Sequence, residues 1–224
     1  MRDVSAARDR AHELLATVRD GAPGATHVKL CGMSREADIT AVNEAAPDLC
    51  GFVVDFPRSH RSVSPERLRE LVAGLEAAIC AVGVFVDEEP ERVAALTQGG
   101  IEVVQLHGGE DERYLARLRT LTDAPIIQAF RVRTKRDVER ANASGADLVL
   151  LDNGWGTGER FDWALAGGIR RPFMLAGGLT PENVGEAVRT FSPWGVDMSS
   201  GIETNRHKDP QKIKAAVAAV RSAR

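Results

Sequence analysis

From residue 27 onward, the sequence alternates eight times between short apolar runs and longer segments whose apolar residues recur at helical spacing. The apolar runs predict strands at 27–31, 50–54, 79–86, 101–107, 125–131, 147–152, 172–176 and 194–198. The longer segments predict helices at 35–46, 64–78, 89–98, 110–121, 134–144, 161–168, 181–190 and 209–222. Several strands, such as 81–86, are apolar almost throughout, as a sheet covered on both faces requires. Eight strand–helix units predict an α/β fold, a single-domain (β/α)8 TIM barrel over residues 27–224.

Residues 1–20 carry a separate helical pattern ahead of the barrel. The apolar side chains that recur at helical spacing are Val4, Ala7, Ala11, Leu14, Leu15 and Val18. The stretch 20–24, which reads Asp-Gly-Ala-Pro-Gly, then breaks the helix. The pattern predicts an N-terminal helical extension over residues 1–26, which either covers one end of the barrel or forms a loosely ordered tail.

The charge balance argues against several classes of partner. The formal net charge is −3 and there is no long basic run, so nucleic acid is not expected as the main partner. No apolar run is long enough to span a membrane, and the charged N-terminus does not resemble a signal peptide. Cys31, Cys50 and Cys80 are too widely spaced for a disulfide framework or a metal knuckle. Together these features predict a cytoplasmic protein without membrane contact.

Two glycine-rich stretches end the last two predicted strands. Residues 173–183 read Phe-Met-Leu-Ala-Gly-Gly-Leu-Thr-Pro-Glu-Asn, and residues 195–201 read Gly-Val-Asp-Met-Ser-Ser-Gly. Glycine lets backbone N–H groups approach an anion closely, and the loops after the last two strands of a (β/α)8 barrel commonly bind phosphate. The pair therefore favours one shared phosphate site over two tight turns without a ligand. Thr180-Pro181 is expected to start the helix that follows.

Four other predicted strands are followed by side chains that suit catalysis or anion binding. Cys31 ends the first strand, where a thiol is either a base or nucleophile or a buried core residue. Asp152 directly follows a buried strand, and burial there favours the protonated carboxyl that acts as a general acid. Arg58 or Arg61, in a basic loop, is suited to clamp a carboxylate. His107 either titrates or makes a structural hydrogen bond.

Together these residues resemble the phosphoribosylanthranilate isomerase family of tryptophan biosynthesis. The matching stretches are Lys29-Leu30-Cys31-Gly32, Phe56-Pro57-Arg58-Ser59-His60-Arg61, Gln105-Leu106-His107-Gly108, Leu151-Asp152 with Gly156-Thr157-Gly158 and Phe161-Asp162-Trp163, Ala176-Gly177-Gly178-Leu179, and Val196-Asp197-Met198-Ser199-Ser200-Gly201-Ile202-Glu203. Any one of these motifs is weak, but all of them in order on the expected strand ends are specific. The resemblance runs from residue 27 to the C-terminus.

The resemblance implies an Amadori rearrangement of N-(5-phosphoribosyl)anthranilate to 1-(2-carboxyphenylamino)-1-deoxyribulose 5-phosphate. It implies Asp152 as the general acid, Cys31 as the general base and Arg61 as the anchor of the anthranilate carboxylate. His107 and Asp197 match motif residues of the substrate site. The residues implied to hold the phosphate are Gly156, Thr157, Gly158, Gly177, Gly178, Ser199, Ser200 and Gly201. Both steps are proton transfers, so no cofactor or metal is expected. The small-molecule substrate is the expected partner, and a homodimer is compatible with the resemblance.

Two other functions fit a phosphate-binding barrel. One is a related isomerase, such as the aminoimidazole carboxamide ribotide isomerase of histidine biosynthesis, whose substrate carries a phosphate at each end. The middle of this chain offers no second glycine-rich site of that kind, since residues 87–89 and 110–111 are acidic. The other function is binding of a phosphorylated metabolite without turnover. The presence of both Cys31 and Asp152 argues against it, because binding alone needs neither.

Overall fold

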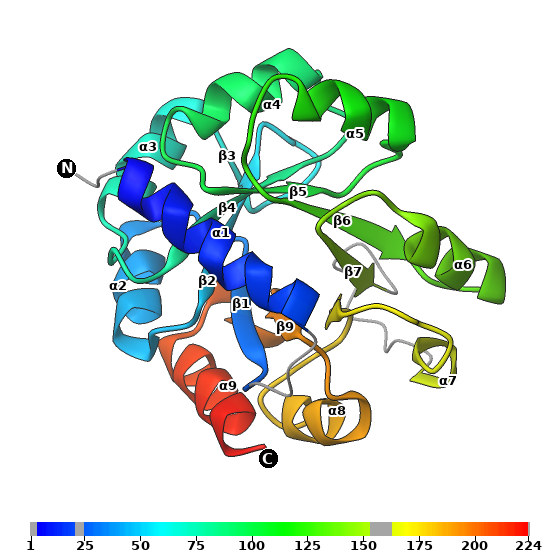
Figure 1. Ribbon diagram of the computed structural model, residues 1–224. Coiled ribbons are helices and arrows are strands. Elements are labelled where there is room, and N and C mark those ends of the chain that lie inside the picture. Colours follow the sequence, from blue (N-terminus) through cyan, green and yellow to red (C-terminus); the bar gives the residue numbers. More distant parts are fainter. Residues whose placement is uncertain (1–3, 21–24, 153–162, 224) are drawn as a thin grey trace.

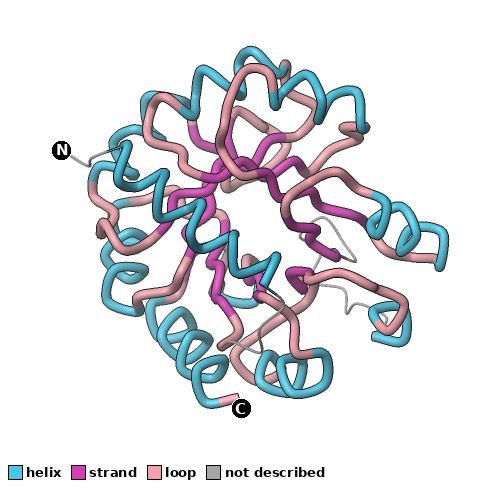
Figure 2. The backbone as a smooth tube through the Cα atoms, viewed as in Figure 1, coloured by secondary structure: helices cyan, strands magenta, loops and turns pink. Residues whose placement is uncertain are grey.

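The computed structural model describes residues 4–20, 25–152 and 163–223, in which eight parallel strands close into a barrel (Figure 1). β1 (His27–Cys31) pairs with β2 (Leu49–Val54) on one side and with β9 (Gly195–Met198) on the other, which closes the ring. The strands between them are β4 (Cys80–Phe85), β5 (Val103–Leu106), β6 (Ile126–Arg131), β7 (Leu148–Asp152) and β8 (Phe173–Leu175). Figure 2 shows the strands as a central ring with helices outside it. The predicted TIM barrel is confirmed.

Helices alternate with these strands and cover the outside of the ring. They are α2 (Glu36–Ala45), α3 (Pro65–Ala73), α4 (Pro90–Thr97), α5 (Glu112–Arg119), α6 (Lys135–Ala143), α7 (Trp163–Ala166), α8 (Val184–Phe191) and α9 (Pro210–Ser222). The expected start of α8 at Pro181 is wrong. The Asn183 side chain accepts a hydrogen bond from the Thr180 amide, which forms a turn, and the helix begins only at Val184. Within the described ranges, no helix is both long enough and apolar enough to cross a membrane.

Four short elements in the segments that follow β2 and β9 were not predicted. β3 (Ser62–Val63) extends the sheet beside the end of β2. After the 3-10 helix η1 (Ser200–Ile202), β10 (Glu203–Thr204) and β11 (His207–Lys208) form a hairpin. Its turn residues Asn205 and Arg206 have left-handed φ angles of 51° and 64°. Strands of two residues carry no alternation, so a periodic pattern cannot reveal them.

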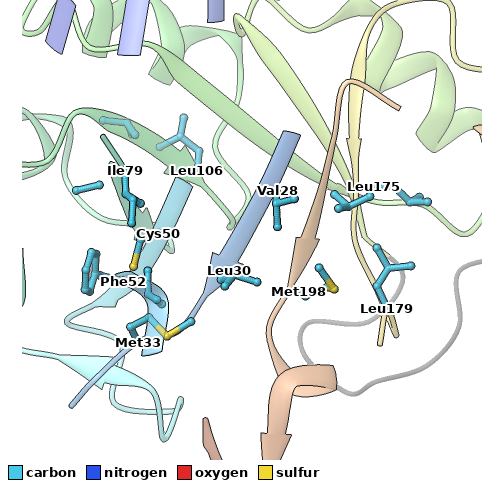
Figure 3. Packing of buried hydrophobic residues seen from close by; sticks show 14 of the residues in the cluster. Val28, Leu30, Met33, Cys50, Phe52, Ile79, Leu106, Leu175, Leu179 and Met198 are labelled. Carbon is cyan, nitrogen blue, oxygen red and sulfur yellow. The ribbon is translucent and has the colours of Figure 1, made fainter. Parts of the chain in front are cut away.

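Two apolar cores stabilise the fold. The outer core lies between the strands and the helices and includes Val28, Leu30 and Phe52 (Figure 3). The inner core lies inside the barrel and includes Leu49, Val82, Ile127, Leu148 and Met174. Side chains alternate along a strand, so β1 directs its even-numbered apolar residues toward the helices and its odd-numbered residues toward the barrel axis. This alternation places two polar side chains, Lys29 and Cys31, inside the barrel.

The N-terminal helix α1 (Val4–Asp20) closes the end of the barrel at which the strands begin. Its side chains in the inner core are Ala11, Leu15 and Val18. Arg8 pairs with Asp123, which lies just before β6, and the Trp194 indole, just before β9, donates a hydrogen bond to Thr17. In Figure 1 the helix runs across the strands of the ring. The helix α1 therefore covers one end of the barrel.

Replacing Leu15 with alanine is expected to destabilise the protein. The side chain is buried in the inner core, and removing a buried leucine side chain costs about 2–5 kcal/mol. For a chain of this size, Tm is expected to fall by at least about 4 °C in calorimetry. Glu13→Ala, on the exposed face of the same helix, is the matched control and should change the free energy of unfolding by less than about 0.5 kcal/mol. If Leu15→Ala and Glu13→Ala had the same Tm, the packing of α1 in the core would be contradicted.

Candidate active site

A pocket opens at the end of the barrel where the strands finish, opposite α1. The predicted site residues that line it are Cys31, Arg61, His107, Asp152, Gly177, Gly178, Asp197, Ser199 and Ser200. Its apolar wall is formed by Val53, Phe56, Val84, Val86, Ala176 and Leu179. The predicted phosphate residues Gly156, Thr157 and Gly158 lie outside the described residues. Arg58, the alternative to Arg61, is exposed and does not line the pocket.

Cys31 ends β1 with its thiol facing the pocket, and the residue is 7% exposed. A Cβ atom at Gly51 of the neighbouring β2 would lie 2.8 Å from Sγ of Cys31, so glycine at that position makes room for the thiol. Burial raises the pKa of Cys31, and the positive charge of Lys29 opposes that rise. Cys50 and Cys80, by contrast, belong to the outer and inner apolar cores. The position of Cys31 thus distinguishes it from the two core thiols.

Lys29 and Asp197 form an ion pair inside the barrel, beside Cys31. Nζ of Lys29 donates a hydrogen bond of 3.0 Å to Oδ1 of Asp197, and the lysine is 0% exposed. The two residues face each other in the register of β1 and β9. Burial lowers the pKa of Lys29, but the charges of Asp197 and Cys31 outweigh burial and raise it, so the amine stays protonated. Asp197 therefore lines the pocket while it is bound to Lys29.

Asp152 ends β7, three strands away from β1 around the ring. Its Oδ2 lies 3.5 Å from Nε2 of His107, and Nδ1 of His107 is 2.9 Å from Nε2 of Gln105. Gln105 and His107 are two residues apart in and just beyond β5, so both side chains face the barrel interior. This chain of contacts holds His107 against a carboxyl group that is largely shielded from water.

Arg61 enters the pocket from the loop between β2 and β3. Its Nε and Nη2 donate to the two carboxylate oxygens of Glu203 at 2.6 and 2.8 Å, and Nζ of Lys208 donates to the same carboxylate at 2.7 Å. Burial raises the pKa of Glu203, but Arg61 and Lys208 outweigh burial and lower it to about 2. A Cβ at Gly32, where φ is +83°, would collide with the Arg61 side chain. Glu203 and Gly32 together fix the position of Arg61.

The two glycine-rich strand ends meet at the pocket. Gly201 packs so closely on Leu179 that a Cβ would collide with the Leu179 carbonyl oxygen. Gly177 and Gly178 have φ angles of 87° and 66°, which residues with side chains rarely adopt. Ser199 also lines the pocket, and its hydroxyl donates a 3.0 Å hydrogen bond to the carbonyl of Cys31 at the end of β1.

The pocket combines a buried carboxyl group, a buried thiol and two features whose chemistry suits anions, the Arg61 guanidinium and the glycine-rich strand ends. A carboxyl group and a thiol can exchange protons with a bound molecule. In the part of the chain that the structure describes, no group of three or more His, Cys, Asp or Glu residues is arranged to hold a metal ion.

Comparison with known proteins identifies the family. The family model described as N-(5'-phosphoribosyl)anthranilate (PRA) isomerase matches residues 28–219. The chain belongs to this family. A phosphoribosylanthranilate isomerase from Endomicrobium trichonymphae is 40% identical over 201 residues, which cover 87% of this chain and 98% of the relative. The match begins after α1, so this helix is an addition to the part shared with the family.

Solved phosphoribosylanthranilate isomerases share the fold. The structure from Thermus thermophilus is 32% identical with a TM-score of 0.80, and the match covers 89% of this chain and 100% of that chain. A second isomerase, in complex with reduced 1-(o-carboxyphenylamino)-1-deoxyribulose 5-phosphate, is 33% identical with a TM-score of 0.75. That match covers 87% of this chain and 98% of the other.

Some polar side chains of this isomerase site were not among the predicted site residues. They are Lys29, Gln105, Glu203 and Lys208. Lys29 and Gln105 each lie two positions before a predicted site residue on the same strand, so strand alternation alone could have identified them. Glu203 and Lys208 lie on the β10–β11 hairpin, which has no periodic signal.

Proposed function

We propose that the chain isomerises N-(5-phosphoribosyl)anthranilate to 1-(2-carboxyphenylamino)-1-deoxyribulose 5-phosphate, a step of tryptophan biosynthesis. Its family and the curated relative carry the name of this activity. The observation that carries the proposal is a buried carboxyl group, Asp152, and a buried thiol, Cys31, on two strands of one pocket. A site that only bound a phosphorylated metabolite would need neither group.

In the first step, Asp152 is the general acid. It donates a proton to the ribose ring oxygen while the bond between that oxygen and C1 breaks. The lone pair of the anthranilate nitrogen forms the C1=N bond of a Schiff base, so no other electron donor is required. His107, 3.5 Å from the Asp152 carboxyl, is proposed to orient the acid toward the ring oxygen.

In the second step, Cys31 is the general base. Its thiolate removes the proton from C2, the C–H electron pair forms a C1=C2 bond, and the C1=N pair returns to nitrogen. Protonation of the resulting enol at C1, with loss of the proton of the C2 hydroxyl to solvent, gives the ketone. Because burial raises the pKa of Cys31 and only the thiolate is a base, kcat/KM is expected to rise with pH until the thiol has titrated.

The two charged ends of the substrate match the two anion-attracting regions. We place the phosphate against the backbone of Gly177, Gly178, Ser200 and Gly201, with Gly156, Thr157 and Gly158 as further contacts. We place the anthranilate carboxylate on Arg61. Glu203 occupies the Nε–Nη2 edge of the guanidinium, and Nη1 has no hydrogen bond among the described residues, so it is available to a second carboxylate.

Replacing Arg61 with alanine is expected to raise KM about ten- to a hundredfold and to change kcat much less. The variant loses a charge-assisted hydrogen bond to the substrate, worth roughly 1.5–3 kcal/mol. Steady-state kinetics measure both constants. Arg58→Ala is the matched control, because Arg58 is an exposed arginine of the same loop that does not line the pocket. A rise in KM for Arg58→Ala but not for Arg61→Ala would contradict the assignment of the carboxylate anchor.

The histidine-pathway isomerase is the competing function, and the loops after β4 and β5 argue against it. The amides of Gly109 and Gly108 donate to the carboxylates of Asp87 and Glu110 at 2.6 and 2.8 Å. These backbone N–H groups are therefore bound to carboxylates and are not free to bind a second phosphate. The negative charge of the carboxylates also repels a phosphate. The enzyme is therefore proposed to act on the substrate with one phosphate and not on the substrate with two.

Growth complementation tests this choice. The same expression plasmid is placed in a bacterial tryptophan auxotroph that lacks phosphoribosylanthranilate isomerase and in a histidine auxotroph that lacks the corresponding histidine-pathway isomerase. We expect growth without tryptophan and no growth without histidine. Cys31→Ala on the same plasmid serves as the inactive control. Growth of the histidine auxotroph would overturn specificity for one phosphate, and failure of the tryptophan auxotroph to grow despite expression of the protein would oppose the proposed function.

Two further proposals concern location and assembly. All three cysteines are free thiols, and free thiols are most common in proteins of a reducing compartment, which supports a cytoplasmic location. A family member from Thermotoga maritima is described as dimeric. We propose a homodimer for this chain on that basis, and light scattering of the purified protein measures its mass.

A further inference from the structure

Lys29 is a fully buried charged residue whose presence the fold alone does not explain. It faces the apolar residue Leu49 in the register of β1 and β2, and the lysine is 0% exposed. Burying an ion pair costs several kcal/mol per ion in desolvation, and replacing such a pair with apolar residues is often neutral or stabilising. The pair of Lys29 with Asp197 is therefore weak as a source of stability, and its position beside Cys31 indicates a role in the site.

The geometry brings the lysine ammonium and the thiol to one place. A Cβ atom at Gly51 would lie 3.0 Å from Nζ of Lys29 and 2.8 Å from Sγ of Cys31. Both atoms therefore lie against the backbone of Gly51, where a side chain on β2 would crowd them. Lys29 and Cys31 are also two residues apart on β1, so both side chains point into the barrel.

The charged groups with the largest effect on Cys31 come from three strands. Lys29 lies on the same strand, Asp197 on β9 and Lys208 on β11, while the residue of β2 that faces Cys31 in the register is the uncharged Gly51. Lys29 opposes the effect of burial more strongly than any other group, Asp197 adds to the effect of burial, and Lys208 contributes less than either. Lys29 is thus the main positive charge that can stabilise a thiolate at this position.

We propose that Lys29 is a positioning residue that stabilises the thiolate form of Cys31 against the effect of burial, with Asp197 as the permanent counterion of the lysine. Before proton transfer, the ammonium faces both the thiolate and the carboxylate. After Cys31 has taken the substrate proton it is neutral, and Asp197 remains to balance Lys29. The ammonium is therefore never left unpaired in the barrel. The inference rests on the proposed function only in taking Cys31 as the general base.

The test measures the thiolate directly, without turnover. Iodoacetamide alkylates the thiolate and releases iodide, so the rate at Cys31 against pH reports the midpoint of its titration. Mass spectrometry assigns the modified peptide and separates it from those of the core residues Cys50 and Cys80. The rates are compared for wild type, Lys29→Met, and the double variant Lys29→Met/Asp197→Leu. Lys208→Met is the matched control, because it removes the other buried lysine of the site.

Lys29→Met should raise the Cys31 midpoint by at least about one pH unit and lower the alkylation rate near neutral pH about tenfold or more. The double variant should lie between wild type and Lys29→Met, because it also removes the opposing charge of Asp197. Lys208→Met should shift the midpoint much less. The acid limb of kcat/KM against pH should move with the alkylation midpoint.

If the pH midpoint of the Cys31 titration in Lys29→Met is equal to or lower than in wild type, the proposal is overturned. If Lys29→Met does not fold, the double variant decides in the same way, since it leaves no unpaired charge. The alkylation test and the activity test can fail separately. If the midpoints shift as expected but the protein does not turn over phosphoribosylanthranilate, the role of Lys29 is supported and the proposed function is rejected.

Discussion

Replacing Cys31 with alanine is expected to lower kcat by about 10²–10⁴-fold or more, the size of a general base contribution, and to leave product affinity within a few-fold of wild type. Alanine cannot accept the C2 proton, whereas the proposed phosphate site and the proposed carboxylate anchor Arg61 do not depend on the thiol. Turnover and product binding are measured on the same preparation. Retained affinity shows that the lost activity does not come from a misfolded protein.

Cys50→Ala is the matched control for this variant. It removes a buried thiol from the neighbouring strand, but that thiol belongs to the outer core and does not line the pocket. Activity close to wild type is expected for this protein. Substantial residual turnover in Cys31→Ala would exclude Cys31 as the base.

Replacing Asp152 with asparagine is expected to lower kcat by about 10²–10⁴-fold, with a smaller change in KM. The amide has nearly the same shape as the carboxyl group but cannot donate the proton that opens the ribose ring. Because His107 contacts the Asp152 carboxyl, the substitution also tests whether the pair acts as a unit. Steady-state kinetics on both proteins measure the two constants.

Asp123→Asn provides the control for this second substitution. It makes the same chemical change in an exposed carboxylate that pairs with Arg8 at the opposite end of the barrel, far from the pocket. Its kinetics should match wild type. A loss of less than tenfold in Asp152→Asn would count against Asp152 as the acid.

The barrel could be predicted because its signals are local and repeated. Each predicted strand lies within two residues of the observed one at either end, since apolar runs between helical patterns mark the strands clearly. The position of Asp152 followed from the same signal, because a polar residue directly after a buried strand must lie at the barrel mouth. The start of α8 was misplaced because residues 181–183 form a turn ahead of the helix, and a cap-and-proline pattern does not distinguish such a turn from the first turn of the helix.

The partners of the site residues were harder to predict because they are distant in sequence. Arg61 and Glu203 are 142 residues apart, and Lys29 and Asp197 are 168 apart. Only closure of the ring between β1 and β9 and folding of the β10–β11 hairpin bring these charges together. A sequence pattern shows which residues face the barrel interior, but it does not show which of them pair there.

Fluorescence of phosphoribosylanthranilate tests the central claim most directly. The substrate is incubated with purified wild-type protein, and the loss of its fluorescence is followed beside a sample in buffer and a sample with Cys31→Ala. The proposed function predicts rapid loss that scales with the wild-type protein concentration, and loss at the buffer rate with Cys31→Ala. Loss at the buffer rate with folded wild-type protein would contradict it.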